Sequence, residues 1–172
     1  KAFKPSEAML YLKTSAFFSS TGGYYENANK VIEEALGDDA VISNGWKSDN
    51  VSEWVKIITK QLSTEQIVSI HKLCDVYVTL SRGEGFDMPA FDAKLSGNLM
   101  MYTPNGGPID FASHWDCRIP MSGMIACHPI YRWESDACYL DFNEEDAIAG
   151  YRTMAARALA WREQHMPHPM DK

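Results

Sequence analysis

The sequence predicts an α/β protein, a Rossmann-like three-layer arrangement in which helices cover both faces of a parallel sheet. Short runs rich in β-branched and aromatic residues alternate with segments of helical periodicity, as in βαβ units. Glycine-rich turns follow several of these runs, at 22–23, 44–45 and 105–108. The length of 172 residues fits one domain, because domains cluster near about 100 to 150 residues.

Before residue 60 we expect three strands and one helix. The helix is expected at about 27–36, because Val31, Ile32, Ala35 and Leu36 share one helical stripe and Gly37 follows as a stop signal. The segment between Trp46 and Trp54 is predicted to be a loop. The strands are expected at 16–20, 39–43 and 55–59.

After residue 60 the pattern becomes sharper. Ser63 and Gln66 resemble a capping box, and the helix they open would bury Ile67, Ile70, Leu73 and Cys74 on its inner face. The next unit is a strand, a loop, a short helix closed by Gly97, a second strand and a turn leading into a short helix. Their expected bounds are 75–81, 82–87, 88–97, 98–103 and 108–112.

The last third of the chain gives a weaker pattern. We expect residues 113–138 to form a long functional loop with a small strand. A final helix is expected from Asn143 to about His165, because acidic residues in its first turn suit the helix dipole.

Composition excludes several classes of partner. The chain has 16 Lys and Arg against 23 Asp and Glu, a net charge of −7, which argues against nucleic acid and anionic membranes. No apolar run approaches the roughly 20 residues of a transmembrane helix. The four cysteines lack metal-ligand spacing. We expect a soluble, cytoplasmic protein without a metal site, and the start at Lys1 suggests a segment of a longer protein.

The strand, glycine loop and helix around residues 81–92 suit an anionic ligand. At the carboxyl end of a parallel strand, the amides that open a helix attract phosphates, and the helix beginning at Met88 would supply them. Gly83 and Gly85 permit close approach of a ligand to the backbone. Glu84 and Asp92 add acceptors on either side of the amides, which suits hydroxyl groups at both ends of a nucleotide sugar.

The turn at 105–107 would add a second group of amides at the next strand end. A glycine loop alone more often marks an ordinary turn, and Glu84 alone is more often a solvated charge. The combination of features carries the prediction.

LSRGEGFDMPAFDAKLSG followed by NGGPIDF resembles the C-terminal, donor-binding domain of retaining GT-B glycosyltransferases of family 4. The resemblance is strong from about Leu62 to Ala112 and looser over 16–59 and 129–161. It implies one half of a GT-B fold, and a donor domain whose acceptor half, normally N-terminal, is missing from this chain. The isolated chain would then bind donor without efficient transfer.

The resemblance also implies roles for individual residues. Glu84 would contact hydroxyls of the transferred sugar, and Arg82 would help meet the charge of the departing diphosphate, so these two are the predicted catalytic residues. The donor would be a UDP or GDP sugar, with no metal or other cofactor. The predicted donor-binding residues are Gly83, Gly85, Phe86, Asp92, Asn105, Gly106 and Gly107.

Two positions depart from the family pattern. Asp92 stands where the family usually has Glu, and Glu26 stands where a Lys is expected to neutralise the diphosphate. Arg82 and Lys30 are the candidates for replacement charge. The alternatives left open are a non-catalytic α/β nucleotide- or sugar-binding module, a protein-interaction domain and a sugar phosphorylase.

Overall fold

The computed structural model describes residues 2–3, 7–13, 42–43, 55–58, 61–126 and 138–165. The chain forms two compact units, one reaching Ser63 and one beginning at Thr64. Ala2 groups with the second unit.

The first unit contains a three-stranded parallel sheet in the order β1-β3-β2. β2 (Ile42–Ser43) and β3 (Val55–Ile58) lie within the strands predicted at 39–43 and 55–59. β1 (Leu10–Lys13) was not predicted. The strand expected at 16–20, the helix expected at 27–36, Glu26 and Lys30 lie outside the described residues.

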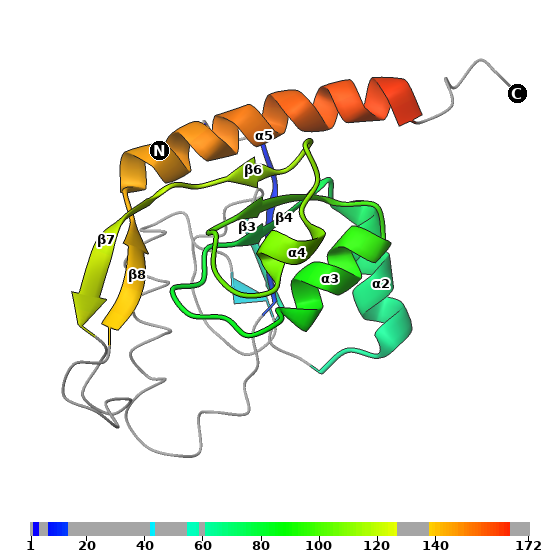
Figure 1. The fold of residues 1–172 in the computed structure, drawn as a ribbon. Helices are drawn as coiled ribbons and strands as arrows, with labels where there is room; N and C mark the ends of the chain where they lie inside the picture. The colour runs from blue at the N-terminus through cyan, green and yellow to red at the C-terminus, as the bar shows by residue number, and fades with distance from the viewer. Residues whose placement is uncertain are drawn as a thin grey trace, which may run out of the picture. The chain divides into compact units, whose positions relative to one another are not determined.

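The second unit contains a parallel sheet in the order β4-β5-β6 (Figure 1). The predicted alternation of strands and helices is confirmed from residue 64 to residue 111. The elements are α2 (Thr64–Leu73), β4 (Val76–Thr79), α3 (Met88–Leu95), β5 (Leu99–Tyr102), α4 (Pro108–Phe111) and β6 (Cys117–Arg118). Mixed α/β structure around a parallel sheet is therefore what the chain adopts.

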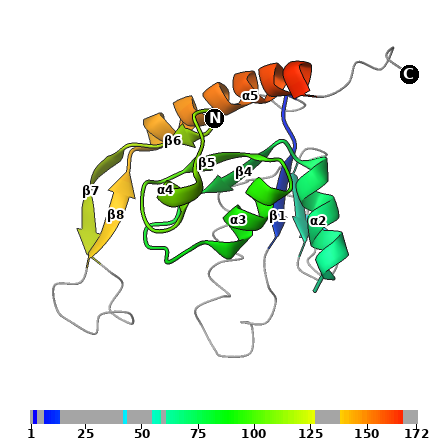
Figure 2. The ribbon, with the colours of Figure 1, turned by 45° about the vertical axis from the view of Figure 1, so that its right-hand side comes forward.

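Helices contact the central strand of this sheet from both faces (Figures 1 and 2). On one face Leu99 and Met101 of β5 pack with Met154 of α5 (Glu144–His165), the predicted final helix. On the other face Met100 of β5 packs with Ala90 of α3. Successive residues of β5 point to opposite faces, and all four are buried, so this strand forms the centre of both cores.

The predicted inner face of α2 is confirmed only in part. Ile70 and Cys74 are half-buried, whereas Ile67 and Leu73 are exposed, Leu73 to 60%, and none of the helix residues is fully buried. Polar contacts hold its end instead, because Asn98 Nδ2 donates to the carbonyl oxygens of His71 (2.9 Å) and Cys74. The apolar stripe therefore predicted that a helix forms here, but it did not predict how far the side chains of the stripe are buried.

The long loop expected at 113–138 is also wrong in part, since it contains β6 and β7 (Met121–Ala126). β7 pairs in antiparallel register with β8 (Cys138–Phe142), and residues 127–137 lie outside the description. The pairing shifts register between Met121 and Gly123, a local irregularity that interrupts the two-residue alternation by which strands are recognised.

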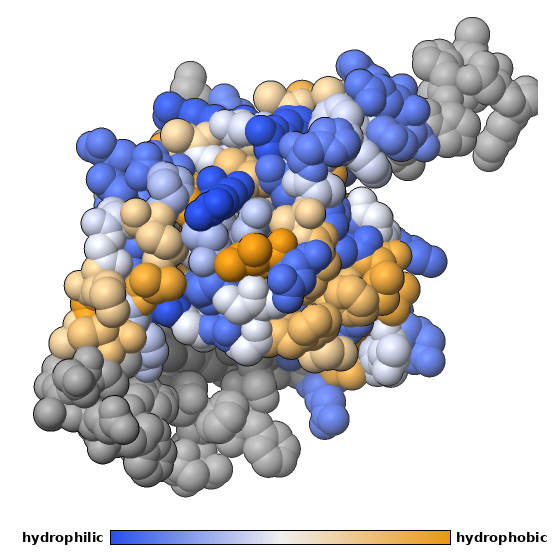
Figure 3. Space-filling model, in the orientation of Figure 1, coloured by the Kyte–Doolittle hydropathy of each residue, from blue (hydrophilic) through white to orange (hydrophobic). Residues whose placement is uncertain are grey.

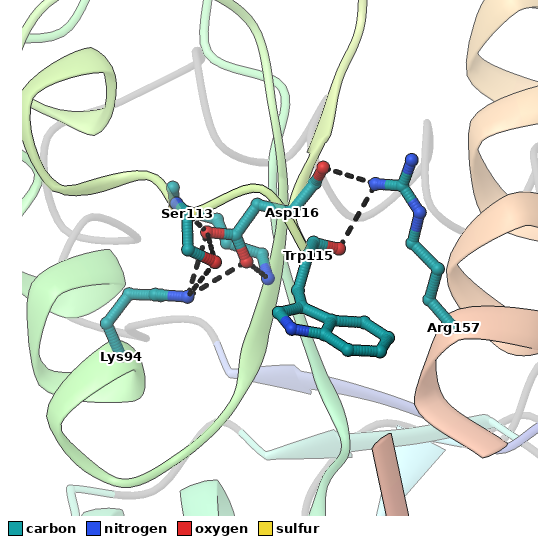
Figure 4. Close-up of polar contacts among 6 residues, drawn as sticks. Lys94, Ser113, Trp115, Asp116 and Arg157 are labelled. Atoms are coloured by element: carbon teal, nitrogen blue, oxygen red, sulfur yellow. Dashed lines mark hydrogen bonds and ion pairs between the residues drawn. The ribbon is translucent and has the colours of Figure 1, made fainter. Parts of the chain in front are cut away.

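A buried carboxylate organises the amino end of the sheet (Figure 4). The Asp116 side chain is fully buried and accepts from Lys94 Nζ (2.8 Å), Met100 N (2.6 Å) and both N and Oγ of Ser113 (2.6 and 3.0 Å). Arg157 of α5 donates to the carbonyl oxygens of Trp115 and Asp116. This network ties α3, β5 and α5 to the chain segment that enters β6.

Over the described ranges, none of the helices combines the length and hydrophobicity needed to cross a bilayer.

Candidate functional site

The loops that follow β4 and β5 meet at one edge of the sheet. Because β4 and β5 are parallel, their carboxyl ends lie side by side, as in the ligand sites of open α/β sheets. Gly107 N donates to Gly85 O at 2.7 Å and joins the two loops directly. The structure thus brings together the loop at 82–87 and the turn at 105–107, which sequence analysis assigned to one site.

Two glycines make this contact possible. A Cβ on Gly106 would lie 2.1 Å from Glu84 O, and a Cβ on Gly107 would lie 2.3 Å from Phe86 O. Gly106 also has a φ of +61°, which side chains disfavour. These glycines are therefore needed for packing of backbone against backbone, whether or not a ligand also approaches.

Hydrogen bonds fix the start of the first loop. Thr103 Oγ1 and Asn105 Nδ2 each donate to Ser81 O at 2.6 Å. Ser81 Oγ in turn donates to Gly83 O at 2.9 Å. The backbone N–H of Asn105 donates to Thr103 O at 2.8 Å, so this amide is already hydrogen-bonded within the turn. Asn105 and its neighbours position the loop that carries Glu84.

Asp87 closes the other end of the loop and was missed by sequence analysis. It is 7% exposed, has a φ of +62°, and its Oδ1 accepts from Ala90 N at 3.0 Å as the cap of α3. Its Oδ2 accepts from Thr79 Oγ1 at 2.5 Å. The sequence signal was an Asp placed just before Met88 and Pro89, since Asp is a preferred cap and Pro suits the first helical turn.

This cap changes the expected source of anion-binding amides. Ala90 N donates to the Asp87 side chain, Phe91 N donates to Asp87 O, and Pro89 has no amide hydrogen. A carboxylate already occupies the positive end of the helix, where a phosphate would otherwise be favoured. Any diphosphate at this edge must therefore find most of its positive partners elsewhere.

Glu84 and Phe86 are presented to solvent by the loop. Glu84 is exposed, and its Oε1 accepts from the amide of Gly85 at 3.2 Å. Phe86 is 45% exposed, with its ring 5.3 Å from the ring of Phe91 and 5.6 Å from that of Phe111. Figure 3 shows hydrophobic surface over α3 and α4 beside this loop. The edge thus offers an acidic acceptor next to an aromatic surface.

The charges of Glu84 and Asp92 affect the pKa values of two neighbouring rings, those of Tyr77 and His71. Burial raises the pKa of Tyr77 to about 12, with further contributions from the charges of Asp87 and Glu84. The His71 ring lies 5.8 Å from the Tyr77 ring, and burial lowers the pKa of His71 while the charge of Asp92 raises it. Glu84 and Asp92 therefore both act on neighbouring rings of α2 and β4.

Arg82 has a partner that sequence analysis did not identify. Its Nε and Nη2 each lie 3.1 Å from Asp141 Oδ1, and its guanidinium lies 5.9 Å from the centre of the Phe142 ring. Gly83 lies against Tyr139, which a Cβ on the glycine would approach to 3.6 Å. Strand β8 thus packs beside the loop, and 59 positions separate Arg82 from Asp141.

No protein-family model and no curated protein matches this chain. Among the described residues, no group of three or more His, Cys, Asp or Glu side chains could hold a metal ion.

Proposed function

We propose that this chain is the donor-binding half of a retaining glycosyltransferase, which moves a sugar from a nucleoside diphosphate to an acceptor alcohol. The observation that carries the proposal is the direct contact between the Glu84 loop and the Gly106–Gly107 turn at the carboxyl ends of two parallel strands. In open α/β sheets this edge is where nucleotides bind. We propose further that the β4-β5-β6 sheet belongs to a Rossmann-like three-layer domain, one half of a GT-B enzyme.

In this proposal the loop at 82–87 binds the sugar of the donor. The Glu84 carboxylate accepts hydrogen bonds from hydroxyls of the transferred sugar, and the backbone of Gly85 and Phe86 lies along the sugar and diphosphate. Asp92, which is exposed on α3, accepts from the ribose hydroxyls. A charged hydrogen bond of this kind contributes about 1.5 to 3 kcal/mol.

The diphosphate is the demanding part of the ligand. Negative charge grows on the leaving group as the glycosidic bond breaks, so positive groups placed beforehand lower the barrier. Arg82 is the cationic residue of this loop. An acceptor-binding half would bring the acceptor, since catalysis in a two-lobed enzyme needs groups from both sides of the cleft.

One observation favours a second candidate, a non-catalytic module that binds nucleotides or sugars. Asp87 places a carboxylate at the start of α3, where an anion-binding domain would leave amides free. A module of this kind would bind neutral hydroxyl-rich ligands through Glu84 and Asp92, and a phosphate group on the ligand would add little to its affinity. Comparison of free sugar with nucleotide therefore separates the two candidates.

The experiment is calorimetric titration of the full chain with UDP, GDP, their glucose conjugates and free glucose. We expect millimolar or tighter binding of at least one nucleotide. Glu84→Gln should weaken binding of the matching sugar conjugate about tenfold and leave the bare nucleotide unaffected, because Glu84 contacts the sugar alone. Glu163→Gln, which changes an exposed acid on α5, is the matched control. Absence of heat with every nucleotide, in a folded sample, contradicts the proposal.

A further inference from the structure

We propose that Asp141 and the diphosphate of the donor compete for Arg82, so that the Arg82–Asp141 ion pair sets the donor affinity of the site. The inference rests on the proposed function and adds to it a residue that contacts no substrate. Asp141 acts through Arg82 and is a positioning residue.

The geometry shows how fully Arg82 is engaged. Two of its nitrogen atoms, Nε and Nη2, lie 3.1 Å from the same carboxylate oxygen of Asp141. Arg82 stands two positions before Glu84 on the loop that carries the predicted sugar contact. The cation closest in sequence to Glu84 is therefore already paired with a carboxylate of the same chain.

The ion pair is placed where exchange is easy. The side chains of Arg82 and Asp141 are 50% and 28% exposed, so the pair is solvated and contributes little to folding. A diphosphate offers several charged oxygen atoms, whereas the aspartate offers a single negative charge, and a guanidinium binds such oxygens in pairs. Arg82 should therefore leave Asp141 when a diphosphate binds beside it.

The surroundings keep the exchange local. Gly83 packs against Tyr139, and Ser81 is bonded to Thr103 and Asn105, so the loop backbone is held on both sides of Arg82. The Phe142 ring lies 5.9 Å from the guanidinium and offers a neutral surface for the cation. Exchange then requires rotation of the Arg82 side chain alone, with no movement of the strand.

The test compares two isosteric variants that each remove one negative charge, and a third variant that removes the Arg82 guanidinium. Asp141→Asn should tighten UDP or GDP binding about twofold to fivefold, because the competing ion pair is weak. Glu163→Gln makes the same change in net charge on the exposed end of α5 and should leave affinity unchanged. Arg82→Gln should weaken binding, and Asp141→Asn should give no further gain when Arg82 is already Gln. Inorganic pyrophosphate is the second probe, since it carries the diphosphate without base or sugar.

Each outcome bears on a different claim. If the unaltered chain binds nucleotide and Asp141→Asn gives no gain or a loss, the competition is overturned while the proposed function stands. A gain with UDP that is absent with pyrophosphate also overturns it, because the competitor is then another part of the donor. If Asp141→Asn binds pyrophosphate more tightly than the unaltered chain does, but neither protein binds any nucleotide, the exchange at Arg82 is supported and the proposed donor-binding function is contradicted. Failure of all variants to bind either probe overturns both.

Discussion

Two carboxylates at opposite ends of the β4-β5-β6 sheet differ in how completely the protein satisfies them. Asp116, at the amino end of β6, is fully buried and accepts from Lys94, Met100 and Ser113. Glu84, beyond the carboxyl end of β4, is exposed and accepts from the amide of its neighbour Gly85. The first acid has its acceptor capacity filled by the fold, and the second has capacity left for a ligand.

The contrast separates acids that hold the fold from acids that can bind a partner. A buried charge is tolerated only when hydrogen bonds and an opposite charge replace the water it loses. An exposed carboxylate on a rigid loop keeps its water and can exchange it for ligand hydroxyls. Arg82 lies between these cases, since it is paired with Asp141 yet half exposed.

The largest expected effect is at the buried end. Asp116→Ala leaves Lys94 charged and partly buried, and it leaves the amides of Met100 and Ser113 without their acceptor. We expect the free energy of unfolding in urea to fall by about 3 to 5 kcal/mol. Glu84→Ala is the comparison and should change it by less than about 0.5 kcal/mol, as at other exposed positions. Equal losses of unfolding free energy in Asp116→Ala and Glu84→Ala would contradict the distinction between a structural acid and an acid that is free to bind a ligand.

The next effect concerns the contact between the loops at the other end. Gly106→Ala would place a Cβ 2.1 Å from Glu84 O at a φ of +61°. We expect a loss of about 2 to 3 kcal/mol in urea unfolding, since backbone must shift and the conformation is strained. Gly85→Ala is the matched control, because a Cβ there would meet nothing within 4 Å. A Gly106→Ala protein as stable as the control would show that the loops do not meet as described.

Sequence analysis succeeded where the signals are local. The unit from β4 to α4 was predicted because a β-branched run, a glycine-containing loop and Gly97 after the last helical turn all lie within a few residues of the element they define. Gly97 has a φ of +95°, the left-handed conformation that ends many helices. The approach of the loop at 82–87 to the turn at 105–107 followed from the parallel order of these elements.

The same reasoning failed where the partner is distant in sequence. Asp141 lies 59 positions from Arg82, and Asp116 lies 22 positions from Lys94, so no local pattern relates either pair. The inner face of α2 was assigned from periodicity, which shows that a helix has an apolar side but not that anything covers it. Asp87, by contrast, carried a local cap signal that was available in the sequence.

The smallest effect tests where Asp92 lies. The pKa of His71 is below 6.5 because the ring is partly buried, and the nearby charge of Asp92 opposes that shift. Asp92→Asn should therefore lower this pKa further, as measured by NMR titration of the imidazole. Because the folded pKa is depressed, the contribution of His71 to stability is complete above pH 6.5 and is lost as pH falls through the folded value. The loss in acid should be larger in Asp92→Asn and absent in His71→Gln.

Glu163→Gln again serves as the control, since it removes an exposed acid on α5. An unchanged His71 titration in Asp92→Asn would place the Asp92 carboxylate away from α2 and Tyr77. A fall in the His71 pKa places the Asp92 carboxylate close enough to α2 for its charge to stabilise the protonated imidazole.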